Sequence, residues 1–274
     1  MAISETVLEM HYHAALMNLF RTTFGLGPGG QINFFKYSPQ KECFVGFDQA
    51  YVMTDLGVDD FFDILQQSAM FNNYNLSEVF IGYFLQFKVV KPMQKSSRYT
   101  PPQVVNRPYY RVDLDTQKNA YTGLSQHELL FNLSRTPGAM VYYACPMLFE
   151  RSELYEVNVD LEKLRLADLQ SCPNSYLDND NHYIFFNNTN DVPIWRSEPV
   201  IGKAISPSDF AHSLVAYAKD LSSIKSVKIL FDTLTNIEAV GLSENAIFFE
   251  NKHRRDILEL THEALTIIRI RREG

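Results

Sequence analysis

The sequence predicts a mixed α/β fold that is followed by an α-rich part. Over roughly the first 150 residues, amphipathic and strand-like patterns alternate in the order helix, strand, strand, strand, helix, strand. Apolar residues make up 46% of the chain and aromatic residues 13%, which is enough to fill a large core. We therefore expect a core in residues 1–150 and an accessory α-rich region in residues 151–274 that packs on it.

The first helix is expected from Ser4 to Phe24. Ser4 is a suitable N-cap residue, Glu5 lies in the first turn, and Gly25 ends the helix. Apolar residues recur at helical spacing along one face: Leu8, Tyr12, Ala15, Leu16 and Leu19. A neighbouring stripe contains the two acids Glu5 and Glu9, which the helix N-terminus favours.

A hairpin is predicted next, with strands Gln31–Tyr37 and Cys43–Met53 joined by a turn-forming segment that contains Pro39. Asp48 falls in the middle of the second strand, where Asp is poorly suited and the neighbours are apolar. It is either an edge-strand residue that faces water or a carboxylate held for a metal ion. Asp59–Phe71 is expected to be a short amphipathic helix.

The third strand, Val79–Val90, is expected to organise the fold. It is rich in aromatic and β-branched residues, as buried strands are. Gln86 and Lys88 are two residues apart, so they lie on the same face of this strand. Because an unpaired buried ammonium is costly, that face must meet something polar or anionic.

The later elements are predicted with less detail. Lys91–Asn119 is proline-rich and is expected to be an extended connection. A helix at Gly123–Arg135, with Ser125 as N-cap, and a buried strand at Gly138–Phe149 complete the core. The accessory region is expected to hold these elements: a broken helix at Arg151–Gln170, a strand at His182–Asn187, a helix at Pro207–Ser222, and one or two helices within Glu244–Arg269.

Charge and cysteine content limit the classes of function. The net charge of −7 argues against a nucleic-acid coat protein. The three cysteines are scattered, which suits a reducing cytoplasm, and no apolar run is long enough to cross a bilayer. No acid occurs from Val79 to Val112, whereas basic residues do. Five of these basic residues are predicted to contact nucleic acid: Lys91, Lys95, Arg98, Arg107 and Arg111. The alternative is that they are ordinary solvated surface charges.

A divalent metal site is the chemistry that these elements favour. Asp48 on one strand can share a cation with the amide oxygen of Gln86 and the backbone carbonyl of Phe87. Glu9 or Glu5 of the first helix would add a further carboxylate. Oxygen ligands of this kind suit Mg²⁺ or Mn²⁺. Lys88 would orient a water molecule or stabilise the charge that develops on a phosphate.

The element order, together with Asp48 and the Gln86-Phe87-Lys88 tripeptide, resembles the PD-(D/E)xK nuclease superfamily. The resemblance implies a restriction-endonuclease-like αβββαβ core within the first 150 residues. It also implies Mg²⁺ ligands at Asp48 and position 86, a lysine at position 88 that positions the attacking water, and a helix acid at Glu9 or Glu5. Gln86 stands where the superfamily usually has an acid, which removes one negative charge from the metal site.

The resemblance leads us to expect a metal-dependent nuclease that acts on DNA rather than RNA, in prokaryotic defence against foreign DNA. The alternative is a catalytically inactive binding or assembly subunit with the same fold, with protein partners or a second copy of the chain. A third hypothesis is an interaction protein with an aromatic surface. Among other candidates, Cys145 is expected to be a packing residue. His127 is expected to lie at the surface, and the alternative is that it faces the same cleft.

Overall fold

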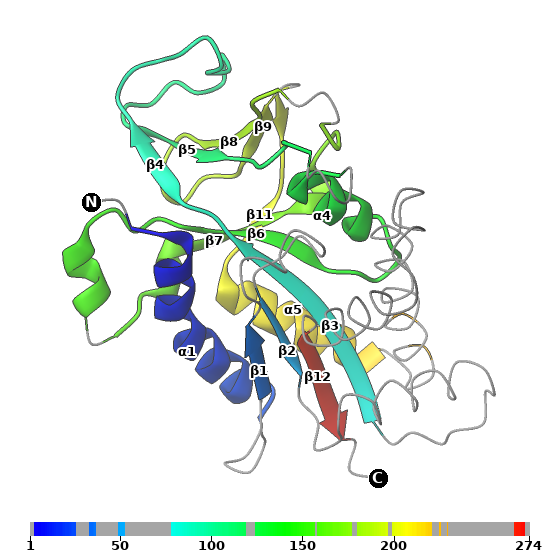
Figure 1. Ribbon diagram of the computed structural model, residues 1–274. Helices are drawn as coiled ribbons and strands as arrows, with labels where there is room; N and C mark the ends of the chain where they lie inside the picture. Colours follow the sequence, from blue (N-terminus) through cyan, green and yellow to red (C-terminus); the bar gives the residue numbers. More distant parts are fainter. Residues whose placement is uncertain are drawn as a thin grey trace.

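The computed structural model describes residues 3–25, 33–36, 49–52, 78–118, 124–156, 158–176, 180–196, 199–220, 225, 229 and 266–271. These residues form two β-sheets and three α-helices, so the expectation of a mixed α/β fold is confirmed (Figure 1). Among them, no helix is both long enough and apolar enough to cross a membrane.

The large sheet has seven strands in the order β1-β2-β12-β3-β6-β7-β11. Their bounds are Asn33–Lys36 for β1, Gln49–Val52 for β2, Glu78–Phe87 for β3, Val141–Pro146 for β6, Leu164–Asp168 for β7, Ala204–Ile205 for β11 and Thr266–Arg271 for β12. β3 pairs in parallel with β6, whereas β1 with β2, β6 with β7, and β12 with β3 are antiparallel. β12 pairs with residues 78–83 of β3. Near the other end of β3, Gln49 of β2 lies opposite Leu85.

The small sheet has five antiparallel strands in the order β10-β9-β8-β5-β4. Their bounds are Val90–Met93 for β4, Tyr109–Asp113 for β5, Tyr183–Phe186 for β8, Ile194–Arg196 for β9 and Val200–Ile201 for β10. β3 and β4 are separated only by Lys88 and Val89. The chain therefore passes directly from the centre of the large sheet to the edge of the small one (Figure 1).

Two helices cover one face of the large sheet, namely α1 (Glu5–Thr23) and α5 (Pro207–Asp220). One hydrophobic cluster joins them to β3, β6 and β7, and it includes Leu16, Tyr83, Phe87, Leu166 and Phe210. α1 begins at the N-cap Ser4, whose hydroxyl accepts a hydrogen bond from the Val7 amide. Its end at Thr23 is followed by Gly25 in the left-handed region.

The opposite face of the large sheet is covered by α4 (Gln126–Ser134) and by the small sheet. A second hydrophobic cluster contains Phe84 of β3, Leu130 of α4, Tyr143 of β6 and Trp195 of β9. Alternation along β3 thus directs Phe84 toward α4 and Tyr83 toward α1. The layers are two helices, the large sheet, and then α4 with the small sheet.

Several predicted elements are confirmed by the structure. The first helix, the antiparallel pair β1 and β2 of the predicted hairpin, the helix capped by Ser125 and the strand within Gly138–Phe149 all form where the sequence indicates. α5 and β8 also match their predictions. The predicted helix Asp59–Phe71 lies outside the described residues.

Three expectations about secondary structure are wrong. The third strand was expected to run to Val90, but it ends at Phe87, and Val90 begins β4 in the other sheet. The connection Lys91–Asn119 contains β4 and β5 instead of being wholly irregular. The broken helix at Arg151–Gln170 is instead three 3₁₀ turns around strand β7.

The region after residue 150 is not α-rich in its described part. That part contains strands β7 to β12 and helix α5, and the described residues 225 and 229 are also helical. Residues 266–269, expected to be helical, belong to β12, and the rest of the predicted Glu244–Arg269 helices lies outside the described residues. Strands from both sides of residue 150 share the large sheet. The division into domains at residue 150 stays a prediction.

We predict that Phe210→Ala lowers the free energy of unfolding by about 3–5 kcal/mol, because it removes a fully buried ring. The Phe210 ring lies 5.4 Å from Tyr83, 6.1 Å from Phe20 and 4.9 Å from Tyr142, centroid to centroid. Urea unfolding measures the change. Tyr155→Ala is the control, because that side chain is 84% exposed; it should change the free energy by less than about 0.5 kcal/mol. Equal effects would contradict the packing of α5 on the sheet.

Candidate functional site

Lys88 lies at the junction between the two sheets. It follows the last residue of β3, and its backbone amide donates a hydrogen bond of 2.9 Å to the Ala144 carbonyl of β6. Two residues later, Val90 begins β4 of the small sheet. The Lys88 side chain is buried, with 5% of the residue exposed. The chain therefore carries an ammonium group into the region where the large sheet, α4 and the small sheet meet.

The Lys88 ammonium contacts the first residues of two helices. Its Nζ donates to Gln126 Oε1 at 2.7 Å and lies 3.5 Å from Glu5 Oε2. Gln126 is the first residue of α4, and Glu5 is the first residue of α1. These contacts supply the polar and anionic partners that a buried lysine requires. Helix N-termini bear partial positive charge, so the Glu5 carboxylate also stabilises the end of its own helix.

Gln86 is 1% exposed and lies opposite Tyr143 of β6. Alternation along β3 places the Gln86 side chain on the α4 side of the large sheet, and Lys88, one residue beyond the strand, contacts Gln126 of α4. Its amide Nε2 lies 3.4 Å from the Phe87 carbonyl oxygen. The Phe87 side chain points the other way, into the cluster with α1.

The two candidate helix acids differ in position. Glu5 contacts Lys88, and its side chain is 40% exposed. Glu9, one turn later, lies on the buried face of α1 and is only 3% exposed. The structure therefore brings Glu5 rather than Glu9 into direct contact with Lys88. Asp48 lies outside the described residues, and no group of three or more His, Cys, Asp or Glu side chains within the described part of the chain could hold a metal ion.

The predicted nucleic-acid contacts lie on the β4–β5 hairpin and the loop between its strands. Lys91 of β4 and Arg111 of β5 both form ion pairs with Asp113. The remaining three, Lys95, Arg98 and Arg107, are exposed on the loop of residues 94–108. Asp113 is the first acid after the acid-free segment Val79–Val112. Its contacts with Lys91 and Arg111 depend on the pairing of β4 with β5, which was not predicted from the sequence.

The expectation that His127 lies at the surface is wrong. His127 is fully buried, and its Nδ1 lies 2.8 Å from the hydroxyl of Tyr143. Its Nε2 lies 3.2 Å from the Asn174 carbonyl oxygen, and its ring stacks on Tyr176. Burial lowers the pKa of His127 to about 4, so the ring is neutral near neutral pH. The signal for burial was available in the sequence, because His127 precedes Leu130 by three residues on the apolar face of α4.

Burial disfavours the thiolate form of Cys145 and Cys172. Cys145 is fully buried in β6, and burial raises the pKa of its thiol, which agrees with its expected role in packing. The Cys172 sulfur lies 3.8 Å from His127 Nε2, an arrangement that a reactive cysteine–histidine pair would need. Burial raises the pKa of Cys172 to about 11, however, so its thiol stays protonated near neutral pH.

The low pKa of His127 predicts a pH dependence of stability. In the unfolded chain the imidazole binds a proton near its usual pKa of about 6.5, whereas in the folded protein it does so only near pH 4. Between these values the unfolded state binds more protons, so stability is full above about pH 6.5 and falls as the pH falls. The loss between about pH 7 and about pH 5 should be roughly 2 kcal/mol.

Urea unfolding of the wild type and of His127→Gln at both pH values measures this effect. Glutamine keeps a hydrogen-bonding amide but does not titrate, so the variant should lose the part of the pH dependence that His127 causes. A variant with the same pH dependence as the wild type would show that folding does not lower the pKa of His127.

Comparisons with known proteins identify no relative. No protein-family model matches the chain, and neither the curated proteins nor the solved structures contain a significant match. Membership of the PD-(D/E)xK superfamily therefore stays a prediction from the sequence.

Proposed function

We propose that this chain is a divalent-metal-dependent nuclease that hydrolyses phosphodiester bonds of DNA. The observation that carries the proposal is the contact between Lys88, at the end of β3, and the helix acid Glu5. A buried lysine two residues after Gln86 and in contact with a carboxylate of the first helix supplies part of the arrangement that this chemistry needs. The choice of DNA over RNA and a role in prokaryotic defence rest on the family resemblance alone.

The order of the described elements supports the same proposal. α1, β1, β2, β3, α4 and β6 follow one another in the order of an αβββαβ core, with β4 and β5 between β3 and α4. Asp48 lies outside the described residues, but it is bonded to Gln49, and Gln49 lies opposite Leu85. Leu85 is the residue before Gln86. The proposal requires the Asp48 carboxylate to lie beside the Gln86 amide.

The donor groups around Lys88 fit a hard divalent cation in type but not in number. The described residues offer the Glu5 carboxylate, the Gln86 amide and the Phe87 carbonyl, all of them oxygen donors. Asp48, with Glu9 as the alternative helix acid, would complete the ligand set for Mg²⁺ or Mn²⁺. When bound, the metal would lower the pKa of a water molecule and neutralise charge on the phosphate.

The contribution of Lys88 follows from its geometry. An ammonium has three N–H donors, and the contacts with Gln126 and Glu5 occupy two of them. The third can donate to a water molecule or to a phosphate oxygen. Because Gln126 and Glu5 fix the ammonium in place, little reorganisation is needed when charge develops on the phosphate. Lys88 is therefore proposed to orient the attacking water and to stabilise the transition state.

A second candidate function is supported by specific features of the same site. Gln86 is neutral where a carboxylate would bind a metal more tightly, and the Glu5 carboxylate already pairs with Lys88. In this alternative the chain is a catalytically inactive subunit that binds DNA or assembles with protein partners. The cluster around Lys88 would then hold three elements together without performing hydrolysis.

We predict that Lys88→Met lowers Mg²⁺-dependent or Mn²⁺-dependent cleavage of plasmid DNA by at least about 100-fold, because it removes the proposed water-orienting group. The matched control is Lys163→Met, which breaks the partly exposed pair of Lys163 with Glu153 and should keep full activity. Methionine is similar in length to lysine, and the Glu5 carboxylate that loses its partner is 40% exposed to water, so the variant should still fold. Cleavage that persists with a chelator, or equal activity of both variants, would contradict the proposal.

Gln86→Glu separates the two candidate functions. If the chain is a nuclease, the added carboxylate should strengthen metal binding and lower the Mn²⁺ concentration needed for cleavage. If the chain is an inactive subunit, the wild type should not cleave DNA at any Mn²⁺ concentration, and this outcome does not depend on the activity of the variant. Plasmid cleavage across a Mn²⁺ titration measures both outcomes.

A further inference from the structure

The loop that joins β4 to β5, residues 94–108, is fixed by a side chain from another strand connection. Asn187, directly after β8, binds the backbone of this loop at three points. Its Oδ1 accepts hydrogen bonds from the amides of Val105 and Asn106, at 2.9 and 3.4 Å. Its Nδ2 donates to the Gln103 carbonyl at 3.0 Å. A loop tied in this way keeps its shape without a ligand.

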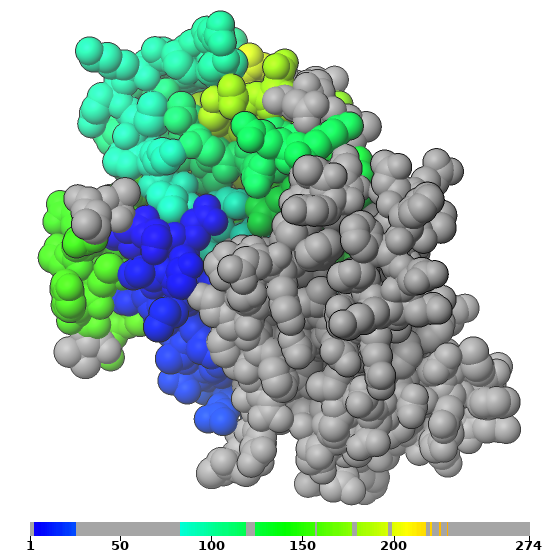
Figure 2. All heavy atoms as spheres, in the orientation of Figure 1, coloured from blue at the N-terminus to red at the C-terminus, as the bar shows by residue number. Residues whose placement is uncertain are grey.

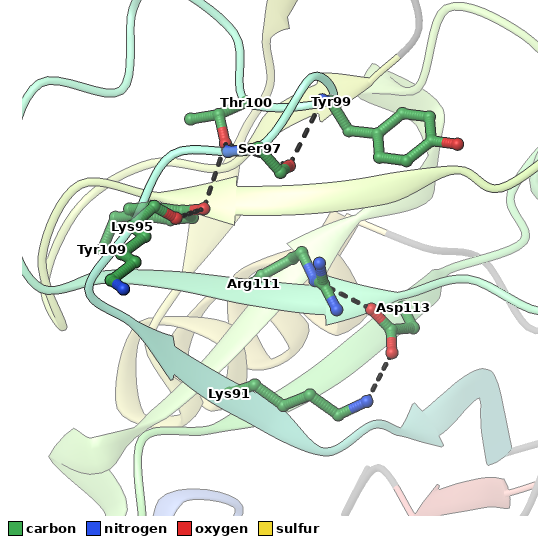
Figure 3. A network of polar contacts seen from close by, with 8 residues as sticks. All are labelled: Lys91, Lys95, Ser97, Tyr99, Thr100, Tyr109, Arg111 and Asp113. Carbon is green, nitrogen blue, oxygen red and sulfur yellow. Dashed lines mark hydrogen bonds and ion pairs between the residues drawn. The ribbon is translucent and has the colours of Figure 1, made fainter.

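The other side of the loop is tied to β5 and β9. The Tyr109 hydroxyl donates to the Lys95 carbonyl at 2.9 Å and lies 3.0 Å from the Thr100 hydroxyl (Figure 3). Arg196 of β9 donates from Nε to the Tyr99 carbonyl at 2.9 Å. Beneath the loop, a third hydrophobic cluster covers the outer face of the small sheet, and it includes Val104, Tyr109, Tyr183, Phe185 and Ile194.

This fixed loop presents three exposed cations, Lys95, Arg98 and Arg107. The Arg98 guanidinium lies 4.7 Å from the centre of the Tyr99 ring, and that of Arg107 lies 5.0 Å from the centre of the Tyr109 ring. The partners of these two groups are neutral rings, hydroxyls and carbonyls. Among the described residues, no carboxylate forms an ion pair with any of the three. Within the described part of the chain, their positive charge is therefore not compensated locally.

The two other basic residues of the hairpin are different. Lys91 and Arg111 lie opposite each other on β4 and β5, and Asp113 bridges them (Figure 3). Its Oδ1 lies 3.0 Å from Arg111 Nε, and its Oδ2 accepts from Lys91 Nζ. The carboxylate offsets part of their charge and holds the side chains against the sheet. Asp113 thus holds these two residues in the hairpin and leaves them with less uncompensated charge than the three cations of the loop.

We propose that the loop of residues 94–108 binds the phosphate backbone of duplex DNA through Lys95, Arg98 and Arg107, and that Lys91 and Arg111 do not contribute. The identity of the polymer rests on the proposed function. Figure 2 shows this hairpin at one end of the molecule, where a long ligand can approach, and β4 begins two residues after Lys88. Contacts to phosphate supply affinity that does not depend on base sequence.

The aromatic side chains of the loop region favour a duplex over a single strand. Single strands are bound largely by stacking of bases on exposed rings. Tyr109 is fully buried, and the half-buried Tyr99 ring is covered by Arg98 and lies 5.4 Å from Tyr183. Neither ring is open for a base. The loop therefore offers charge without a stacking platform.

The test is fluorescence anisotropy with a labelled duplex of about 20 base pairs, at roughly 50 to 200 mM salt, with chelator and no divalent metal. Three phosphate contacts predict a slope of about −2.7 for log Kobs against log salt, or about 40-fold weaker binding across this range. The variant Lys95→Gln/Arg98→Gln/Arg107→Gln should lose most of the slope and of the affinity at low salt. The matched variant Lys91→Gln/Arg111→Gln should keep both.

Two further variants separate charge from loop shape. Arg98→Lys/Arg107→Lys conserves charge and should keep the slope. Asn187→Ala removes the three hydrogen bonds to the loop but no charge. It should weaken binding at every salt concentration while the slope stays the same. Circular dichroism and urea unfolding verify that each variant is folded.

Several outcomes would overturn the inference. These are wild-type affinity in the triple variant, loss of the slope in Lys91→Gln/Arg111→Gln, equal binding of a single strand, or equal competition by polyglutamate at the same charge concentration. Because binding is measured without metal, a chain that binds DNA through the loop but never cleaves it would disprove only the proposed hydrolysis. A chain that cleaves DNA while the triple variant binds normally would disprove only the role of the loop.

Discussion

The buried ammonium of Lys88 is the constraint on which the rest of the structure depends. An unpaired ammonium in the interior would cost several kcal/mol, so the fold must bring polar groups to it. Those groups are Glu5, at the start of α1, and Gln126, at the start of α4. Their positions require α1 to pack on one face of the large sheet and α4 on the other, with both helices starting near the end of β3. Packing in the two hydrophobic clusters thus brings both helix N-termini to the Lys88 ammonium.

The proposed contact between Lys88 and a phosphate rests on the charges at this junction. The first residues of two helices meet one ammonium, and helix N-termini add partial positive charge to it. The Glu5 carboxylate offsets the Lys88 charge, so among the described groups the helix N-termini contribute the remaining partial positive charge. A divalent cation would need more negative charge than Glu5 and the neutral Gln86 supply. That is why Asp48 is essential to the proposed hydrolysis and not to binding of DNA through the loop.

The sequence predicted local features well where capping and periodicity were strong. Ser4 and Gly25 defined α1, Ser125 defined α4, and the pair Gln86 and Lys88 indicated a polar site on a buried strand. β4 was missed because Pro92 argues against a strand, yet β4 is the edge of the small sheet, where proline is tolerated. β7 was missed because Leu164–Asp168 is short and lies between 3₁₀ turns.

The partners of Lys88 could be predicted only in part. A helix acid was expected, but the choice between Glu5 and Glu9 depends on where α1 starts relative to β3. Gln126 was not foreseen, because it lies 38 residues after Lys88 in the chain and only packing brings the two together. His127 was wrongly predicted to lie at the surface, although the helical spacing of α4 was sufficient to predict its burial. It lies three residues before Leu130, on the same buried face of the helix.

The most direct test of the central claim is a calorimetric titration of Mn²⁺ into the wild type and into Asp48→Asn. The wild type should bind Mn²⁺, and the variant, which has one carboxylate fewer but the same shape, should bind it much more weakly or not at all. If the wild type binds no Mn²⁺, or if Asp48→Asn binds it as tightly, the proposal of a metal-dependent nuclease centred on Lys88 and Asp48 is contradicted.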